Sequence, residues 1–338
     1  MMTNEQLMAK MDQAFKAITA DDLDEGKLAK QKFDRFVQVM QRRTIILNEA
    51  RFLEMDSHKV EIDRIGFMDR IITEGVKDDD TSVGSESTKK PTFKTNELVA
   101  KELRAITGLK DRALRRNIER GNFEDTLVDL FGEAAGRDLE EWAILAATDS
   151  VTNDITGFDN YSGDDAILGL TDGWIARADN VVYGDAEGVS KDDPEAIFDE
   201  LLKSLPKRYL QNRSEWRFYV PWDIEDNYRN LLRERGTDLG DRATTNAIEL
   251  FYKGIPVRYV PMLDKAKSPS EGWGDVVMLQ HPDNLVWGVF YEVFIERERD
   301  AKNRQTDFVL TFEGDADYED EEAAAVCLLE YDEGDDSR

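Results

Sequence analysis

The stretch Asn122–Ala147, which reads NFEDTLVDLFGEAAGRDLEEWAILAA, contains the clearest helix pattern in the chain. It starts with Asn122, a residue type whose side chain caps helix N-termini, and Glu124 and Asp125 follow in the first turn, where the helix dipole favours acidic groups. Apolar residues then recur at spacings of three and four, which predicts one wide apolar face: Phe123, Leu127, Leu130, Phe131, Ala134, Leu139, Trp142 and Leu145. Over about 25 residues such a helix is roughly 37 Å long. We expect it to form the backbone of a domain.

The composition is that of a soluble globular protein with a sizeable core. Of the 338 residues, 41% are hydrophobic and 34% are charged, and six are tryptophan. With 72 acidic and 44 basic residues the formal net charge is -28, so binding to a phosphate backbone, which needs clustered Lys and Arg, is not expected. The simplest interpretation of this charge is a solvated, self-repelling surface. A surface that faces packed nucleic acid without adhering to it would also be acidic.

The single cysteine, Cys327, lies in the apolar run 323–329. It has no partner for an internal disulfide, and its surroundings favour core packing over a reactive thiol. The N-terminal residues show no basic segment followed by an apolar one, and no window approaches the roughly 18 apolar residues of a membrane span. We therefore expect a reducing cytoplasm and no membrane.

The N-terminal third predicts segments that cannot make a core of their own. Residues 4–55 read as helix, with an apolar stripe that is too narrow to fold alone: Leu7, Met11, Phe15 and Ile18. We expect this segment to lie on its own domain or on a neighbouring subunit. Residues 58–105 read as two extended arms around a polar tract at 77–91, which predicts a long hairpin.

From residue 194 onward, helical and extended segments alternate. Helices are predicted over 194–210 and 223–235, and strands over 216–221 and 254–261. Residues 150–193, rich in Gly, Asp and Asn, read as loop with short strands. Four further extended runs are predicted at 276–279, 285–296, 307–312 and 323–329, and the acidic tail 331–338 is expected to be disordered.

No constellation of catalytic, cofactor-binding or metal-ligating residues emerges. The two histidines, His58 and His281, are far apart in sequence, and His281 before a proline is expected in a solvated turn. There is no Cys–His cluster, no phosphate-binding glycine loop with its lysine, and no nucleophile elbow. The acidic runs 78–80 and 315–322 match no calcium-loop pattern, so solvated acidic turns are expected there.

The order of these elements resembles the Hong Kong 97-type major capsid proteins of tailed bacteriophages: an N-terminal arm, a long hairpin, a long spine helix, an alternating α/β region and a strand-rich return. Residues 99–111 resemble the family's passage from hairpin to spine, and 122–147 its spine helix. Similar runs follow in the family's helix-then-strand unit, its Gly-x-Pro-Val strand entry and its last apolar strand: 194–206 with 216–221, 254–257, and 323–329. The likeness is strongest between residues 95 and 260.

The resemblance implies an α+β fold of the Hong Kong 97 type with five parts. The implied parts are an N-terminal helical arm at 1–57, an extended hairpin loop at 58–105, a peripheral domain at 106–190 with its spine helix at 122–148, an axial domain at 191–290, and return strands of the peripheral domain with the acidic tail at 291–338. The axial region would form the contacts around five- and six-fold axes.

The resemblance also implies a structural subunit, not an enzyme, that assembles into pentamers and hexamers of an icosahedral shell around double-stranded DNA. The implied partners are copies of the chain, a portal, scaffold or decoration proteins, and genomic DNA bound without sequence specificity; no cofactor and no membrane are implied. The implied location is the virion, assembled in the host cytoplasm. The residues expected to carry assembly are Lys89, Lys90, Phe93, Leu130, Trp142 and Trp216.

Three other functions are open from the sequence. An encapsulin-like cellular nanocompartment of the same fold would package an enzyme, whereas a phage shell has a portal. A cation-dependent carboxylate enzyme would need paired acidic residues that stand out from the acidic background, and none do. A nucleic-acid mimic would suit the charge, but such proteins are usually small, and this chain has a large aromatic core.

Overall fold

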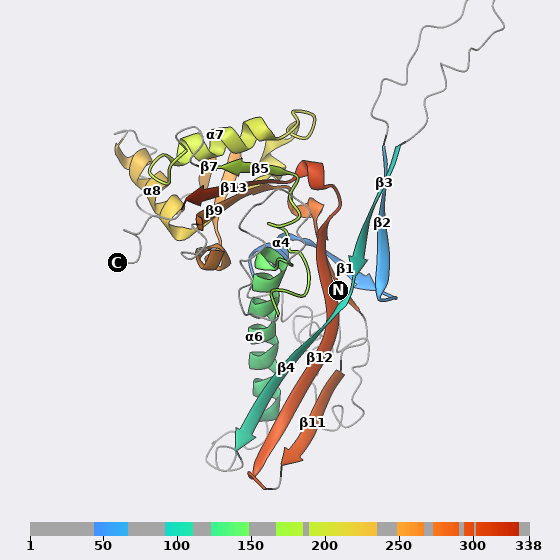
Figure 1. The fold of residues 1–338 in the computed structure, drawn as a ribbon. Helices are drawn as coiled ribbons and strands as arrows, with labels where there is room; N and C mark the ends of the chain where they lie inside the picture. The colour runs from blue at the N-terminus through green and yellow to red at the C-terminus, as the bar shows by residue number, and fades with distance from the viewer. Residues whose placement is uncertain are drawn as a thin grey trace, which may run out of the picture.

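The computed structural model describes residues 44–66, 92–110, 123–148, 167–184, 189–234, 249–266, 273–290, 294–300 and 302–330. Within these ranges the chain forms a six-stranded sheet, a five-stranded sheet, a two-stranded ribbon and three longer helices. Figure 1 shows the six-stranded sheet at one end of the molecule, a long arm of one helix and three strands at the other, and the ribbon beside them. No described helix is long and apolar enough to cross a membrane.

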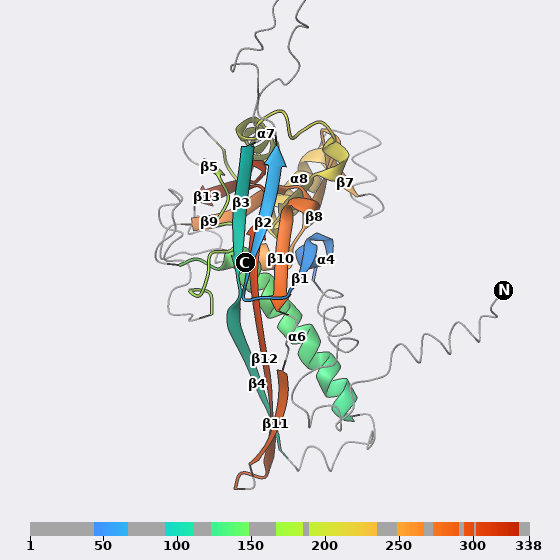
Figure 2. The ribbon, with the colours of Figure 1, turned by 90° about the vertical axis from the view of Figure 1, so that its right-hand side faces the viewer.

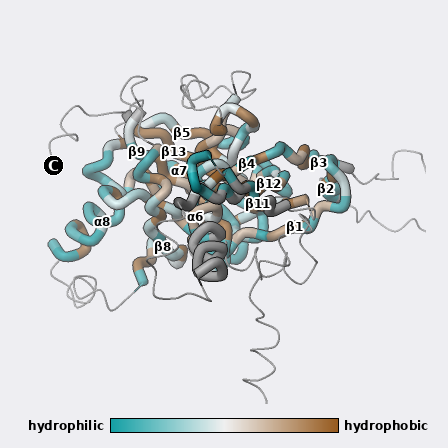
Figure 3. The backbone as a smooth tube through the Cα atoms, turned by 90° about the horizontal axis from the view of Figure 1, so that it is seen from below, coloured by the Kyte–Doolittle hydropathy of each residue, from teal (hydrophilic) through white to brown (hydrophobic). Residues whose placement is uncertain are grey.

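The six-stranded sheet has the strand order β5-β13-β9-β6-β8-β7. Its strands are β5 (Asn180–Tyr183), β6 (Arg217–Val220), β7 (Leu250–Tyr252), β8 (Ile255–Tyr259), β9 (Trp273–Gln280) and β13 (Ala325–Glu330). Two helices, α7 (Pro194–Ser204) and α8 (Trp222–Glu234), pack on one face, where Phe198 contacts the rings of Phe218, Tyr228 and Tyr252. In Figure 3, α8 is mostly hydrophilic, as expected for a helix that buries a single stripe.

The five-stranded sheet is organised around one long strand, β12. Its strands are β1 (Arg51–Met55), β4 (Lys101–Lys110), β10 (Leu285–Phe290), β11 (Phe294–Asp300) and β12 (Gln305–Tyr318). Strand β12 pairs with β4 on one side, and with β11 and then β10 on the other. Because β12 is longer than any of its neighbours, it spans the five-stranded sheet from the end that holds β11 to the end next to the six-stranded sheet.

The predicted spine helix is present as α6 (Phe123–Leu145), which runs beside β4 and β12 (Figure 1). Asn122 lies outside the described residues, so its capping role stays a prediction. The C-terminal half of α6, with Trp142, is buried in a core that contains residues of both sheets, among them Tyr219 of the six-stranded sheet and Phe312 of the five-stranded sheet. This helix therefore ties the arm to the six-stranded sheet.

The ribbon consists of β2 (Lys59–Gly66) and β3 (Thr92–Val99), paired antiparallel with Lys59 opposite Val99 and Gly66 opposite Thr92. They match the two extended arms predicted from the sequence as far as Val99; residues 101–105, which the predicted hairpin at 58–105 included, belong to β4 and pair with β12 instead. Figure 2 shows the ribbon running alongside β10. Residues 67–91 between the arms, which include Lys89 and Lys90, lie outside the described residues.

Two predicted helices are wrong in part. The end of the helix predicted over 4–55 is strand β1, which pairs parallel with β10; this long-range pairing overrides the local helical spacing. Residues 1–43 lie outside the described residues. The helix predicted over 194–210 ends at Ser204, because Leu205 precedes Pro206 and is extended, with φ -74° and ψ 137°.

Glu140 fixes the point at which the N-terminal part of the chain reaches α6. Its Oε1 accepts the backbone N–H groups of Ile45 and Ile46 at 2.7 and 2.6 Å, at the start of the short helix α4 (Ile46–Glu49). Burial raises the pKa of Glu140, and the backbone donors oppose that shift. Glu140 is 2% exposed, so its carboxylate, and not water, accepts the hydrogen bonds of these two N–H groups at the helix N-terminus.

Removing the acceptor oxygen of Glu140 should destabilise the fold, whereas a substitution that keeps an oxygen at this position should not. Glu140→Ala should lower the free energy of unfolding by about 1–3 kcal/mol, because two buried N–H groups lose their partner. Glu140→Gln keeps an acceptor oxygen and should retain most of that stability. Urea unfolding of the unassembled chain, followed by tryptophan fluorescence, measures both. Equal losses in the two variants would show that the hydrogen bonds contribute little.

Candidate functional site

The acidic run Glu313–Glu322 connects the two sheets. It contains the end of β12 and the start of the 3-10 turn η6 (Glu321–Ala323), and β13 of the six-stranded sheet follows. The solvated acidic turn predicted at 315–322 is wrong, because Asp315, Asp317 and Asp320 are only 2%, 4% and 6% exposed. The ribbon rests on this run, and we call residues 313–322 the hairpin seat.

Arg177 neutralises the buried carboxylates of β12. Its Nη1 lies 2.6 Å from Oδ2 of Asp317, and its Nη2 lies 3.5 Å from Oδ1 of Asp315. The hydroxyl of Thr171 donates to Asp315 at 3.1 Å, and Nε1 of Trp174 donates to the backbone oxygen of Asp317 at 3.1 Å. A buried carboxylate needs a cation or several donors, so these contacts fix the loop after α6 onto β12.

The seat holds more negative charge than Arg177 can balance. Burial raises the pKa of Asp317 to about 6, even though Arg177 opposes the shift. Burial also raises the pKa of Asp315, again against the attraction of Arg177. Two carboxylates beside one guanidinium leave one surplus negative charge in a buried site. Uptake of a proton by this site is therefore favourable well above the pKa of an ordinary aspartate.

Buried contacts attach the base of the ribbon to the seat. The backbone N–H of Val99 donates to Oδ2 of Asp315 at 2.8 Å. Nδ2 of Asn96 donates to the backbone oxygen of Tyr318, also at 2.8 Å. The apolar side chains buried together beneath the ribbon are Met55, Ile62, Leu98 and Val286. The base of the ribbon is therefore part of the core of the molecule.

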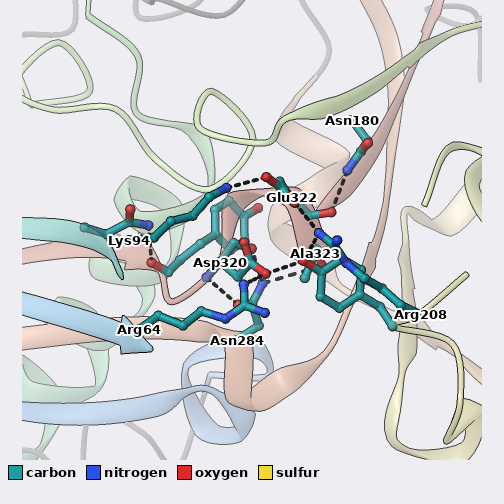
Figure 4. Close-up of polar contacts among 11 residues, drawn as sticks. Arg64, Lys94, Asn180, Arg208, Asn284, Asp320, Glu322 and Ala323 are labelled. Atoms are coloured by element: carbon teal, nitrogen blue, oxygen red, sulfur yellow. Dashed lines mark hydrogen bonds and ion pairs between the residues drawn. The ribbon is translucent and has the colours of Figure 1, made fainter. Parts of the chain in front are cut away.

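Further along the ribbon, two cations reach the seat. Arg64 pairs with Asp320, and Lys94 pairs with Glu322 (Figure 4). Arg64 and Lys94 are register partners on neighbouring strands, so both side chains lie on the same face of the ribbon. That inner face also carries the apolar residues of the base. It is turned toward the two larger sheets and their helices, which we call the body of the molecule.

Side chains of the body hold the seat from the other side. Oδ1 of Asn284 accepts the backbone N–H of Asp320 at 2.8 Å, and its Nδ2 donates to the backbone oxygen of Asp320 at 3.0 Å. The hydroxyl of Tyr209 donates to the carboxylate of Asp320 at 2.5 Å, and Arg208 pairs with Glu322 beside the ribbon lysine. Asp320 thus joins Arg64 of the ribbon to Tyr209, and Glu322 joins Lys94 of the ribbon to Arg208, as Figure 4 shows for Glu322. The seat thus connects three parts of the fold.

The six residues predicted to carry assembly do not converge on this site. Trp142 and Trp216 are each 2% exposed, Trp142 in the core beneath α6 and Trp216 in the core between the six-stranded sheet and its helices. Lys89 and Lys90 lie outside the described residues. Phe93 and Leu130 are described by their backbone alone, in β3 and α6. A role of all six in assembly stays a prediction.

Sequence reasoning missed Arg64, Lys94 and Arg177. A signal existed for Arg64, because it continues the two-residue alternation of Val60 and Ile62 on the apolar face of β2. A cation on that face needs an acidic partner on the body. For Arg177, no local pattern marks the residue, and the carboxylates that it pairs with, Asp315 and Asp317, are more than a hundred positions away.

Three observations on the described residues concern groups that could take part in chemistry. They contain no group of three or more His, Cys, Asp and Glu side chains placed to hold a metal ion. Cys327 is fully buried, as predicted, and burial raises its pKa to about 12, so it is a thiol at neutral pH. His281 lies in a turn, as predicted, but its ring is half-buried against Trp216, and Nδ1 accepts the backbone N–H of Asp283 at 3.2 Å.

Comparison with known proteins supports the capsid resemblance. A protein of Bacillus subtilis (strain 168) that is named as a prophage capsid protein, YqbE, is 26% identical over 337 residues, which cover 97% of this chain and 99% of the relative. No model of a known protein family matches the chain.

Solved structures give the same result for the fold. The satellite phage P4 procapsid, including its size determination (Sid) protein, has a TM-score of 0.60 at 14% identity, over 97% of this chain and 98% of that chain. The capsid of a native GTA particle has a TM-score of 0.55 at 14% identity, over 87% and 90%. Mycobacterium phage Che8 gives 0.54 at 12% identity, over 84% and 90%. The chain therefore has the mixed α+β fold of phage capsid structures, and the predicted resemblance is confirmed.

The surplus charge in the seat should make stability depend on pH through Asp317. Its pKa is raised on folding, so the folded chain binds a proton that the unfolded chain has lost between about pH 6 and pH 4. The stability of the wild type relative to Asp317→Asn should therefore increase as the pH falls from 7 to 4, by on the order of 2 kcal/mol. Urea unfolding at several pH values measures this difference. A change of opposite sign would mean that Arg177 dominates and lowers the pKa.

The ion pairs of Arg64 and Lys94 should hold the ribbon at one angle. Because Cys327 is buried, spin labels can be attached selectively to exposed cysteines introduced by Glu61→Cys on the ribbon and Lys207→Cys on the body. In Arg64→Gln/Lys94→Gln, we expect the distance distribution between the labels to broaden in double electron–electron resonance. Lys203→Gln, which removes an exposed pair with Glu200 on α7, is the matched control and should leave a narrow distribution. An unchanged distribution in the double variant would show that the buried base alone fixes the angle.

Proposed function

We propose that this chain is the major subunit of a virus shell with the Hong Kong 97-type fold, and that it assembles into pentamers and hexamers around double-stranded DNA. The observation that carries this proposal is the anchored ribbon, whose inner face is held on the seat while its outer face stays exposed. In an assembly, such a projection reaches a neighbouring subunit. The likeness to phage capsid proteins over nearly the whole chain supports the same conclusion.

The parts of the fold take different roles in this proposal. The ribbon and the residues between its strands, 59–99 of the predicted 58–105, form the extended loop that reaches a neighbour, and residues 101–105 belong to β4 of the five-stranded sheet. Helix α6 with the five-stranded sheet forms the peripheral domain, to which the return strands β11 and β12 belong. Strands β6 to β9 with α7 and α8, within 191–290, form the axial domain around the five- and six-fold axes, and β5 and β13 complete its sheet from outside that range. Residues 1–57 form the N-terminal arm.

The proposal assigns no catalytic step to the chain. Its partners are other copies of itself, a portal, scaffold or decoration proteins, and packaged DNA that is held without sequence readout. Its place is the virion, after assembly in the host cytoplasm. A net charge of -28 suits a shell whose inner surface must not adhere to the genome.

Assembly of the purified chain tests the proposal. Size-exclusion chromatography with negative-stain electron microscopy, on the chain alone and with the products of neighbouring genes, should show closed shells or hexameric and pentameric units. A clean monomer at every concentration and with every partner would contradict it. Packaging of an enzyme in place of DNA would favour a cellular nanocompartment.

Two sets of variants in the same assay separate assembly from folding. Lys89→Glu/Lys90→Glu should reduce the yield of particles and leave the thermal unfolding transition of the unassembled chain in place. Trp142→Pro should lose both the particles and the transition, because proline in a helix interior costs about 3 kcal/mol or more. Normal particles from Lys89→Glu/Lys90→Glu would contradict the role of the loop.

A further inference from the structure

The outer face of the ribbon is exposed and acidic. Its charged residues are Glu61, Asp63 and Glu97 with a single base, Lys59, so three carboxylates and one ammonium leave a net charge of -2. Glu61 and Glu97 are direct register partners, and like charges in that position disfavour each other. Lys59 lies 2.7 Å from Glu97, and this contact and the nearby carboxylates raise the pKa of Lys59. Lys59 is thus the single cation beside the two facing carboxylates of Glu61 and Glu97.

A basic surface extends from the end of α7 to the start of β6. Residues 203–217, KSLPKRYLQNRSEWR, contain five basic residues and one acidic residue, a net charge of +4 in a chain whose total is -28. Lys207 and Arg213 are exposed, and their side chains have no hydrogen bond or ion pair with any other described residue. Pro206 and the 3-10 turn η3 (Arg213–Glu215) restrict the backbone around them. We call residues 203–217 the basic corner.

The chain cannot join these two surfaces within itself. The inner face of the ribbon is held on the seat by Arg64 and Lys94, so the outer face is turned away from the body. The basic corner belongs to the body and contacts the seat through Arg208 and Tyr209. The outer face of one ribbon therefore meets a basic corner only on another molecule.

We propose that the acidic outer face of the ribbon binds the basic corner of a second copy of this chain. The inference rests on the proposed function and names the surfaces that meet in it. The contact joins two different patches, so it is heterologous, and contacts of this kind close into rings when the rotation between copies allows. Both surfaces are exposed, so their attraction acts chiefly on the rate and register of association and weakens with salt.

Charge reversal and its compensation test this contact. Glu61→Lys/Glu97→Lys and Lys207→Glu/Arg213→Glu should each slow assembly, followed by light scattering, on the order of tenfold at low salt. Combining the four changes in one chain restores opposite charges and should recover most of the rate. The matched controls Glu102→Lys/Glu298→Lys and Lys302→Glu/Arg304→Glu change exposed charges of the five-stranded sheet, outside both surfaces and outside the axial domain, and should assemble like the wild type.

A second readout does not depend on closed shells. Zero-length carbodiimide crosslinking of mixed isotopically light and heavy chains should join Glu61 or Glu97 of one copy to Lys207 of another.

Two results of the assembly assay would overturn the inference and leave the proposed function standing. The first is that the double variants assemble like their controls, and the second is that the fourfold variant assembles no faster than either double variant. A wild type that neither assembles nor crosslinks would overturn both the inference and the proposed function. Loss of duplex DNA retention, with unchanged assembly, in Lys207→Glu/Arg213→Glu would assign the corner to nucleic acid instead.

Discussion

Two carboxylates on one face of β12 cannot be buried without a cation, and this requirement organises the centre of the molecule. Asp315 and Asp317 are two positions apart, so they share a face of the strand and meet the same guanidinium, that of Arg177. Asp315 also accepts the backbone N–H of Val99 at the base of the ribbon. One small cluster therefore fixes the loop after α6, the long strand of the arm and the start of the ribbon. Removal of Arg177 would leave two buried negative charges, which is among the most destabilising changes available to a protein.

Charge is arranged in layers from this cluster outward. The seat is acidic, the inner face of the ribbon supplies Arg64 and Lys94 to it, and the outer face is acidic again. Attachment within the subunit thus uses the basic face of the ribbon and leaves its acidic face exposed. The basic corner is the complementary surface on the body. A strongly acidic chain can still associate with itself when a basic surface of one copy meets an acidic surface of another.

The sequence predicted the elements whose pattern is local. The long apolar stripe gives α6, the two-residue alternation at 60–63 gives β2, and Gly254–Val257 leads into β8 as expected. It did not predict β1, because strand formation at 51–55 depends on pairing with β10 more than two hundred residues away. It also misread the acidic run at 315–322, since local composition alone favours solvent exposure. Burial of that run depends on Arg177, Arg64 and Lys94, which only the folded chain brings together.

The most direct test of this account is a cryo-electron microscopy map of particles assembled from the chain, at a resolution that resolves side chains. The account predicts that Asp315, Asp317 and Asp320 are buried between the sheets, with Arg177 between Asp315 and Asp317. It also predicts that each ribbon stays held on its own seat while its outer face contacts the next subunit. A map in which this acidic run is solvated and the ribbon folds back wholly onto its own chain would contradict it.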